Sequence, residues 1–347
     1  MLEKLVNISK YAGMREDLVQ AGGGNSSVKL SPEKMLIKAS GYQLADVSET
    51  EGYAVVNPKV IVDFFETTPL EDIKKEDEKR LLQEAFIEGK RPSIETFLHS
   101  ITGKVTLHTH AVLVDMMAAR KDGMEEIRKL FPGAMIVPYA TPGIELAVEY
   151  FRAYQLSGKT RTDIVFLQNH GLIVSADTDC GVIQKTEEVL EKIARALKMD
   201  YQSYADTTVL YDKFKESGFS GEIVYQAQNR RIYEAYAVFD GQSWNHVICP
   251  DCVVYCGRKI LELQEGKEAE GIRDFTARYG KPVVILYRNQ FYILAQSVKK
   301  AKEIESMLAF SAEIARVDMG KEMSYLTEKE QDFLLDWDAE KYRRNMK

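Results

Sequence analysis

The 347-residue sequence lacks the features of three broad protein classes. Four cysteines are too few for a disulfide scaffold. No stretch approaches the roughly 18 consecutive apolar residues that a membrane span needs. The formal net charge of −7 leaves no excess of basic residues for a nucleic-acid surface. We therefore expect neither a membrane nor a nucleic acid among its partners.

A nicotinamide-binding turn and a secretion signal are also missing. The richest glycine turn, Gly22-Gly23-Gly24, follows a helical pattern rather than a strand, unlike the turn of a dinucleotide-binding fold. The first residues are charged and amphipathic, without the sustained apolar core of a signal peptide. The 45% hydrophobic residues suffice for a large core, so we expect a globular protein in the cytoplasm.

Histidine is scarce too, but three of the five histidines fall in a pattern that can bind metal. His108 and His110 lie one residue apart in a strand-like run, and His170 follows a second such run. Side chains at positions i and i+2 of a strand point to the same face, so one ion can contact both imidazoles. Three imidazoles with an open position are typical of catalytic zinc. Unrelated histidines on ordinary strands are the alternative.

Two turns of small polar residues precede the histidines. Gly24-Asn25-Ser26-Ser27 and Lys38-Ala39-Ser40-Gly41 each border an extended segment. Backbone N–H groups and short side-chain donors in such turns can converge on an anion, which suits a phosphate monoester. A simple hairpin connection would explain either turn taken alone.

One carboxylate lies between these turns and the histidine pair. The segment Pro92-Ser93-Ile94-Glu95 predicts the start of a helix over 93–101. Glu95 would then lie near the positive end of the helix dipole, where a carboxylate is stabilised as a base. The alternative role for Glu95 is to complete the helix cap.

Taken in order, five motifs resemble those of the class II aldolase/adducin family, over about residues 1–200. The pattern is most similar to the aldolase half of rhamnulose-phosphate aldolase/alcohol dehydrogenase fusions, in which the acid is usually aspartate. The five motifs are Gly24-Asn25-Ser26-Ser27, Lys38-Ala39-Ser40-Gly41, Pro92-Ser93-Ile94-Glu95, His108-Thr109-His110 and Asn169-His170-Gly171.

The resemblance implies a role for each motif. It assigns the general acid/base to Glu95. Zinc would be bound by His108, His110 and His170, and the substrate phosphate by Asn25, Ser40, Gly41 and Ser93. Aldolases that act on ketose 1-phosphates often have a second serine at the position of Ile94. One phosphate donor is therefore missing, which leaves the phosphate or its pose open.

These residues predict a zinc-dependent aldolase-type lyase that cleaves or forms a C–C bond in a small phosphorylated sugar or keto acid. Zinc would chelate the oxygens of the substrate and stabilise the charge of an enediolate, while Glu95 moves a proton. A decarboxylase or an epimerase on the same metal site stays open, although epimerases of the family usually carry aspartate at the acid position. Adducin-like members are binding modules without the zinc histidines, and the intact triad argues against that class.

Family members commonly assemble as tetramers with the active site at a subunit interface. The resemblance therefore implies a homo-oligomer, either a tetramer or a dimer. Whether a neighbouring subunit supplies a catalytic tyrosine stays open, because a second lobe of this chain could replace that neighbour or redirect assembly.

The predicted fold class is α/β. The resemblance implies a three-layer α/β/α domain with a mostly antiparallel central sheet. Strands are expected at about 26–31, 34–39, 53–56, 104–110, 134–137, 163–168 and 171–175. Helices are expected near 2–20, 58–66, 75–89, 93–101, 111–121, 143–155 and 179–198.

The length predicts a second domain, and we place the boundary near residue 205. Residues 1–205 would form the zinc domain, and 206–347 a smaller α/β lobe. The order strand, turn, strand, helix in 164–195 recurs in 283–316, with Asn289-Gln290 in place of His170. We interpret the lobe as a degenerate copy that cannot hold zinc, although such a unit also recurs by chance.

A cysteine cluster in the second half of the sequence could have either of two roles. Its members are His246, Cys249, Cys252 and Cys256. Thiolates prefer soft metals, so a zinc or iron–sulfur site is conceivable, but no second CxxC pair accompanies it. We favour a structural role, with 252–256 as a buried strand in which cysteine acts as a small apolar residue.

Overall fold

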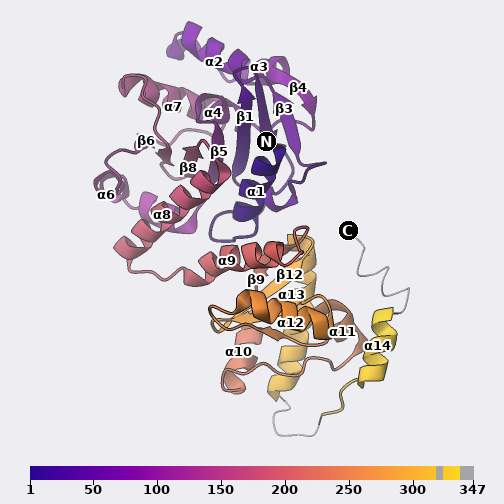
Figure 1. Cartoon of the computed structure of the whole chain (residues 1–347). Helices are drawn as coiled ribbons and strands as arrows, with labels where there is room; N and C mark the ends of the chain where they lie inside the picture. Colours follow the sequence, from indigo (N-terminus) through magenta and orange to yellow (C-terminus); the bar gives the residue numbers. More distant parts are fainter. Residues whose placement is uncertain (318–322, 337–347) are drawn as a thin grey trace. The chain divides into compact units, whose positions relative to one another are not determined.

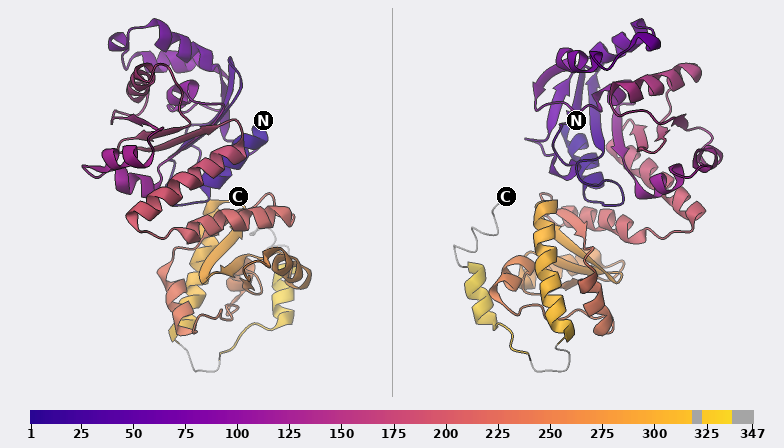
Figure 2. Two further views of the ribbon diagram at one scale, coloured as in Figure 1. Left: turned by 60° about the vertical axis from the view of Figure 1, so that its left-hand side comes forward. Right: turned by 180° about the vertical axis from the view of Figure 1, so that it is seen from behind.

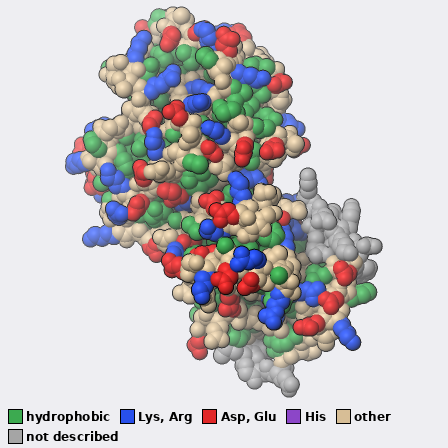
Figure 3. Space-filling view, viewed as in Figure 1, with side chains coloured by type: hydrophobic (Ala, Val, Ile, Leu, Met, Phe, Trp, Pro, Cys, Tyr) green, Lys and Arg blue, Asp and Glu red, His purple; other side chains and the backbone are tan. Residues whose placement is uncertain are grey.

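The computed structural model describes residues 1–317 and 323–336, in two compact units, Met1–Tyr201 and Gln202–Lys347 (Figure 1). Both units mix helices with a sheet, which confirms the predicted α/β class. Among the residues described, no helix combines the length and apolar content needed to cross a bilayer. Acidic and basic side chains are interspersed over the face drawn in Figure 3.

An eight-stranded sheet forms the centre of the first unit, in the order β4-β3-β2-β1-β5-β8-β7-β6. Strands β6 and β7 are parallel, and the other neighbouring pairs are antiparallel, as expected. The strands are β1 (Asn25–Ser31), β2 (Lys34–Lys38), β3 (Tyr53–Val56), β4 (Phe86–Gly89), β5 (Val105–Thr109), β6 (Met135–Val137), β7 (Ile164–Leu167) and β8 (Gly171–Ala176).

Helices cover both faces of this sheet (Figure 2). Leu172 and Val174 of β8 lie in a core with α1, α5 and α8, whereas Ile173 lies in the opposite core with α2, α4 and α7, as alternation along a strand requires. The three-layer arrangement is therefore confirmed. The helices are α1 (Leu2–Gly13), α2 (Pro58–Thr67), α3 (Asp77–Ala85), α4 (Thr96–Ile101), α5 (Val112–Ala118), α6 (Gly123–Leu130), α7 (Ile144–Leu156) and α8 (Asp179–Leu197).

The sequence-based boundaries are wrong in several places. Helix α1 ends at Gly13, which packs against the Ala45 backbone so closely that a Cβ would lie 2.1 Å from the Ala45 nitrogen. Residues 86–89, predicted to be helical, form β4 because they pair with β3. Helix α4 starts at Thr96, three residues later than predicted, and α6 was not predicted.

The second unit has a four-stranded sheet in the order β10-β11-β12-β9. Its strands are β9 (Ile223–Gln226), β10 (Leu261–Glu262), β11 (Val284–Tyr287) and β12 (Gln290–Ala295). Its helices are α9 (Gln202–Glu216), α10 (Arg230–Val238), α11 (Pro250–Cys256), α12 (Glu268–Tyr279), α13 (Val298–Val317) and α14 (Glu328–Asp336). The strand predicted at 252–256 is wrong, because Pro250 begins helix α11 there.

The second sheet has the topology of half of the first. Strands β5-β8-β7-β6 correspond to β9-β12-β11-β10, with antiparallel pairs at the first two junctions and a parallel pair at the third. Helix α13 follows β12 as α8 follows β8, and α12 precedes β11 as α7 precedes β7. The order of strand, turn, strand and helix that recurs in the sequence is therefore present in the structure of both units.

Candidate metal and catalytic site

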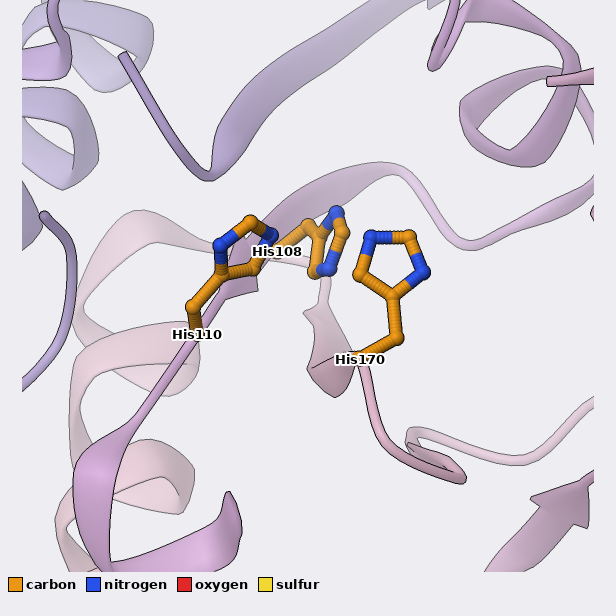
Figure 4. A group of neighbouring side chains, drawn as sticks. All are labelled: His108, His110 and His170. Atoms are coloured by element: carbon orange, nitrogen blue, oxygen red, sulfur yellow. The ribbon is translucent and has the colours of Figure 1, made fainter. Parts of the chain in front are cut away.

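Three imidazoles meet where β5 ends in the first unit (Figure 4). His108 lies on β5, His110 follows just after it, and His170 lies in the turn between β7 and β8. Because β5 pairs with β8, this turn is held beside the end of β5. One nitrogen of each ring lies within 4.8 Å of the others, so this group of described residues could hold a metal ion.

Glycines allow the backbone to close around the imidazoles. Gly171 has φ +144°, and a Cβ there would lie 2.1 Å from the Thr109 carbonyl oxygen. At Gly23, a Cβ would lie 2.8 Å from His110 Nδ1. Only glycine permits these approaches, so the hairpin and the glycine turn both lie against the histidines.

The histidine nitrogens fit a metal ion. His108 Nε2 and His170 Nδ1 are buried without a hydrogen-bond partner, which costs free energy that a bound ion would recover. Burial, and then repulsion by His108, lowers the pKa of His110 and of His170 to about 4, so both rings are neutral at pH 7. A neutral imidazole is the form that binds metal, and three imidazoles suit zinc.

Glu95 lies beside two of these rings, immediately before α4. Its Oε2 accepts a hydrogen bond from His108 Nδ1 at 3.2 Å, and its Oε1 lies 3.9 Å from His170 Nε2. The proton on Nδ1 leaves the lone pair of His108 Nε2 free for a metal. Burial raises the pKa of Glu95, but the electrostatic interaction and the hydrogen bond with His108 outweigh it and hold the pKa at about 2. The carboxylate is therefore ionised at neutral pH.

The predicted phosphate residues lie in two places. Ala39 bridges Pro92, and Ser40 N donates to Arg91 O at 2.9 Å, so the turn of Ser40 and Gly41 lies beside Ser93. A Cβ on Gly41 would meet no atom within 4 Å, so space is open there. The Ser93 hydroxyl accepts from Glu95 N.

Asn25 lies on β1, opposite His108 of β5. Its Oδ1 accepts from Ser26 N, and its Nδ2 is buried without a partner. Asn25 therefore has an unpaired amide donor on the strand next to His108.

Two buried residues near Glu95, Lys38 and His99, have no role in the prediction from the sequence. Lys38, the last residue of β2, is 3% exposed; burial lowers its pKa and the charge of Glu95 opposes that shift. His99 lies one turn after Glu95, with Nδ1 2.7 Å from Ser27 Oγ and Nε2 unpaired. A lysine between Ile37 and Ala39 of an apolar strand was the available signal for Lys38.

The cysteine cluster of the second unit does not gather around a common point. His246 Nε2 donates to Gly257 O at 2.7 Å, and Cys256 Sγ donates to Ile304 O at 3.7 Å. Cys249 and Cys252 remain together, with their sulfurs 3.4 Å apart. The hypothesis of a zinc or iron–sulfur site in this cluster therefore has no support in the described residues.

Solved structures that are similar to this chain include those of three microbial proteins. The N-terminal class II aldolase domain of a conserved protein from Thermoplasma acidophilum is 22% identical, covers 56% of this chain and 93% of its own, and gives a TM-score of 0.48. A sugar-phosphate aldolase from Thermotoga maritima is 17% identical, with coverage of 56% and 94% and a TM-score of 0.41. L-fuculose-1-phosphate aldolase from Thermus thermophilus is 17% identical, covers 57% of this chain and 95% of its own, and gives a TM-score of 0.36.

No curated protein matches the chain. The family described as the Class II Aldolase and Adducin N-terminal domain matches residues 3–198. This match covers more than half of the sequence and includes the three histidines and Glu95. The chain therefore belongs to the class II aldolase and adducin family.

Proposed function

We propose that the protein is a zinc-dependent lyase of the class II aldolase type, which cleaves or forms a C–C bond in a small phosphorylated sugar. The observation that carries this proposal is the convergence of three imidazoles, two of them with an unpaired buried nitrogen, beside an ionised carboxylate. Adducin-like binding would require none of these features.

His108, His110 and His170 would hold the ion. When bound, a zinc ion would polarise the substrate carbonyl and stabilise negative charge that develops on its oxygen. The side chains of His110 and His170 are only partly buried, so this end of the group can be reached by a substrate. Glu95 fixes the orientation of the His108 ring through the bond to Nδ1.

Glu95 would transfer the proton. When the C–C bond of a β-hydroxy ketone breaks, the hydroxyl loses its proton as the aldehyde forms, and the bonding electrons pass to the carbonyl side. An ionised carboxylate can accept that proton and return it to the carbon of the ketone product. Oε1 is the available atom, because Oε2 already accepts from His108.

The turn residues would bind the anionic end of the substrate. Ser40, Gly41 and Ser93 lie side by side, and Asn25 has an unpaired Nδ2. The ammonium of Lys38, buried near Glu95, would bind the phosphate in its protonated form, which the charge of Glu95 favours and burial opposes.

A decarboxylase or epimerase is the second candidate. Ile94 packs against Gly143 and provides no hydroxyl where aldolases of ketose 1-phosphates often have serine. A keto-acid phosphate with a different anion pose would tolerate this change. The product distinguishes the reactions, since an aldolase releases an aldehyde, a decarboxylase releases carbon dioxide, and an epimerase yields an isomer.

The first experiment measures metal in protein purified without added metal, by elemental mass spectrometry. We expect about one divalent ion per chain in the wild type and a loss of it in His170→Ala. Gln290→Ala, in the corresponding hairpin of the second unit, is the matched control and should retain the ion. Screening of ketose phosphates and 3-oxo acid phosphates follows.

Two results would contradict the proposal. Absence of metal even after zinc is supplied would favour an adducin-like binding module, and retention of metal by His170→Ala would require another ligand set.

We further expect a homo-oligomer in the cytoplasm, a tetramer or a dimer, and light scattering measures its mass.

A further inference from the structure

Two cysteines of the second unit lie in contact outside any metal group of the described residues. Cys249 precedes α11 and Cys252 lies within it, separated by Pro250 and Asp251. Their sulfurs are 3.4 Å apart. A disulfide has an S–S length of about 2.05 Å, so side-chain rotations that move the sulfurs together by roughly 1.4 Å would join them.

The two thiols differ in accessibility. Cys249 is partly exposed, whereas Cys252 is completely buried. Burial, together with the hydrogen bond to Cys249, raises the pKa of Cys252 to about 11. An external reagent therefore meets Cys249 first, and Cys252 is placed to react only with Cys249.

The remaining members of the cluster do not join this pair in a ligand group, because no group of three or more ligand atoms found among the described residues includes them. His246 Nε2 donates to the Gly257 carbonyl, and Cys256 is buried and bonded to the Ile304 carbonyl. A tetrahedral zinc site would need both of them or two substitutes. The contact between Cys249 and Cys252 thus has the geometry of a dithiol rather than of a metal knuckle.

We propose that Cys249 and Cys252 form a reversible dithiol–disulfide pair that exchanges with a small disulfide such as glutathione disulfide. The Cys249 thiolate attacks one sulfur of glutathione disulfide, whose S–S bond breaks and releases one glutathione thiolate. Cys252 gives its proton to that thiolate and attacks the Cys249 sulfur, releasing the second glutathione. Two electrons from the cysteine pair thereby reduce one disulfide to two thiols.

The test uses the reduced full-length protein with a metal chelator present. The protein is treated with glutathione disulfide, free thiols are then blocked with N-ethylmaleimide, and the intact mass is measured. We expect Cys249 and Cys252 to lose their thiols without retaining glutathione, and peptide mapping to find a Cys249–Cys252 bond. Dithiothreitol should restore both thiols.

Single variants separate the two roles. Cys252→Ser should stop at glutathione bound to Cys249, because no second thiol resolves it. Cys249→Ser should slow the loss of the Cys252 thiol at least tenfold, because Cys252 is buried. Cys180, exposed on α8 without a neighbouring thiol, is the internal reference and should retain glutathione. Cys256→Ser should leave the pair intact.

Three results would overturn the proposal. The wild type could retain glutathione on Cys249 as the Cys252→Ser variant does. Both thiols could remain free after Cys180 has reacted completely. Protection of the pair in a parallel sample that contains no chelator would instead identify a metal site. None of these measurements depends on the lyase reaction, so failure here leaves the proposed function untouched.

Discussion

The sheets of the two units end in the same way but carry different side chains. Ile173 pairs with His108 in the first unit, and Tyr292 pairs with Gln226 in the second. Each of these pairs lies two residues past the hairpin, which closes at Gly171 and at Gln290. His108 and His110 therefore correspond to Gln226 and Gln228.

The comparison shows that a shared topology does not determine chemistry. In the second unit, Gln226 Nε2 donates to Gln290 Oε1 at 3.2 Å, although Gln226 Oε1 is buried without a partner. In the first unit, nitrogens of His108 and His170 have no partner within the protein. The group whose unpaired atoms are imidazole nitrogens is the one that fits a metal ion.

Removal of the carboxylate should produce the largest effect. Glu95→Gln keeps the shape but cannot accept a proton, so turnover should fall about 10²- to 10⁴-fold while metal is retained. Steady-state kinetics on the identified substrate and elemental analysis measure both. Glu145→Gln, at an exposed carboxylate in the first turn of α7, is the control. Unchanged turnover in Glu95→Gln would remove Glu95 from the reaction.

An alanine substitution should destabilise the hairpin of the first unit more than the hairpin of the second unit. Gly171→Ala places a Cβ against the Thr109 oxygen at a φ that favours glycine, so it should destabilise the first unit by about 3 kcal/mol. Gln290→Ala should cost about 1 kcal/mol, the value of one hydrogen bond. Denaturation followed by circular dichroism measures both changes. Equal effects in the two hairpins would contradict this difference in packing.

The stability of the second unit should depend on pH through His246. Burial lowers its pKa to about 4, against roughly 6.5 in the unfolded chain. Between these values the unfolded chain binds a proton that the folded unit does not, so stability falls as pH decreases from about 6.5 to 4. The loss should reach about 3 kcal/mol.

His246→Gln keeps a donor for Gly257 O and should flatten this pH profile. Trp244 is buried in the second unit and residues 1–201 contain no tryptophan, so tryptophan fluorescence follows the unfolding of the second unit. An equally steep profile in the variant would assign the pH dependence to other groups.

The turn residues should produce the smallest difference. Asn169 and Asn289 both have positive φ, which glycine adopts without strain. Asn169→Gly should change stability by less than about 0.5 kcal/mol. Asn289→Gly loses the hydrogen bond from Tyr236 and should cost about 0.5–1 kcal/mol. Urea denaturation measures the free energy of unfolding of both variants. A larger loss of stability in Asn169→Gly than in Asn289→Gly would contradict the prediction.

The sequence predicted those elements whose pattern is local. Strand β5 and the β7–β8 hairpin were expected because alternating apolar residues border His108 and His170. Strand β4 was missed because its four exposed residues form a strand only through pairing with β3. Helix α11 was mistaken for a strand, since a short apolar run fits either structure until its packing is known.

The candidate site was predictable in composition but not in contacts. The histidine spacing predicted their convergence, and the structure places them together. The hydrogen bond of Glu95 to His108, and the burial of Lys38 near Glu95, depend on β1, β2, α4 and β5 meeting in space. Residues distant in the sequence carry no local signal of such proximity.

The histidines come from two segments that are about sixty residues apart in the chain. An ion bound by His108 and His170 would act as a cross-link that closes this loop, and the free energy of binding would add to that of folding. A chelator should then lower the melting temperature of the first unit and leave that of the second unchanged. Thermal resistance of one half of the molecule would thus depend on metal supply.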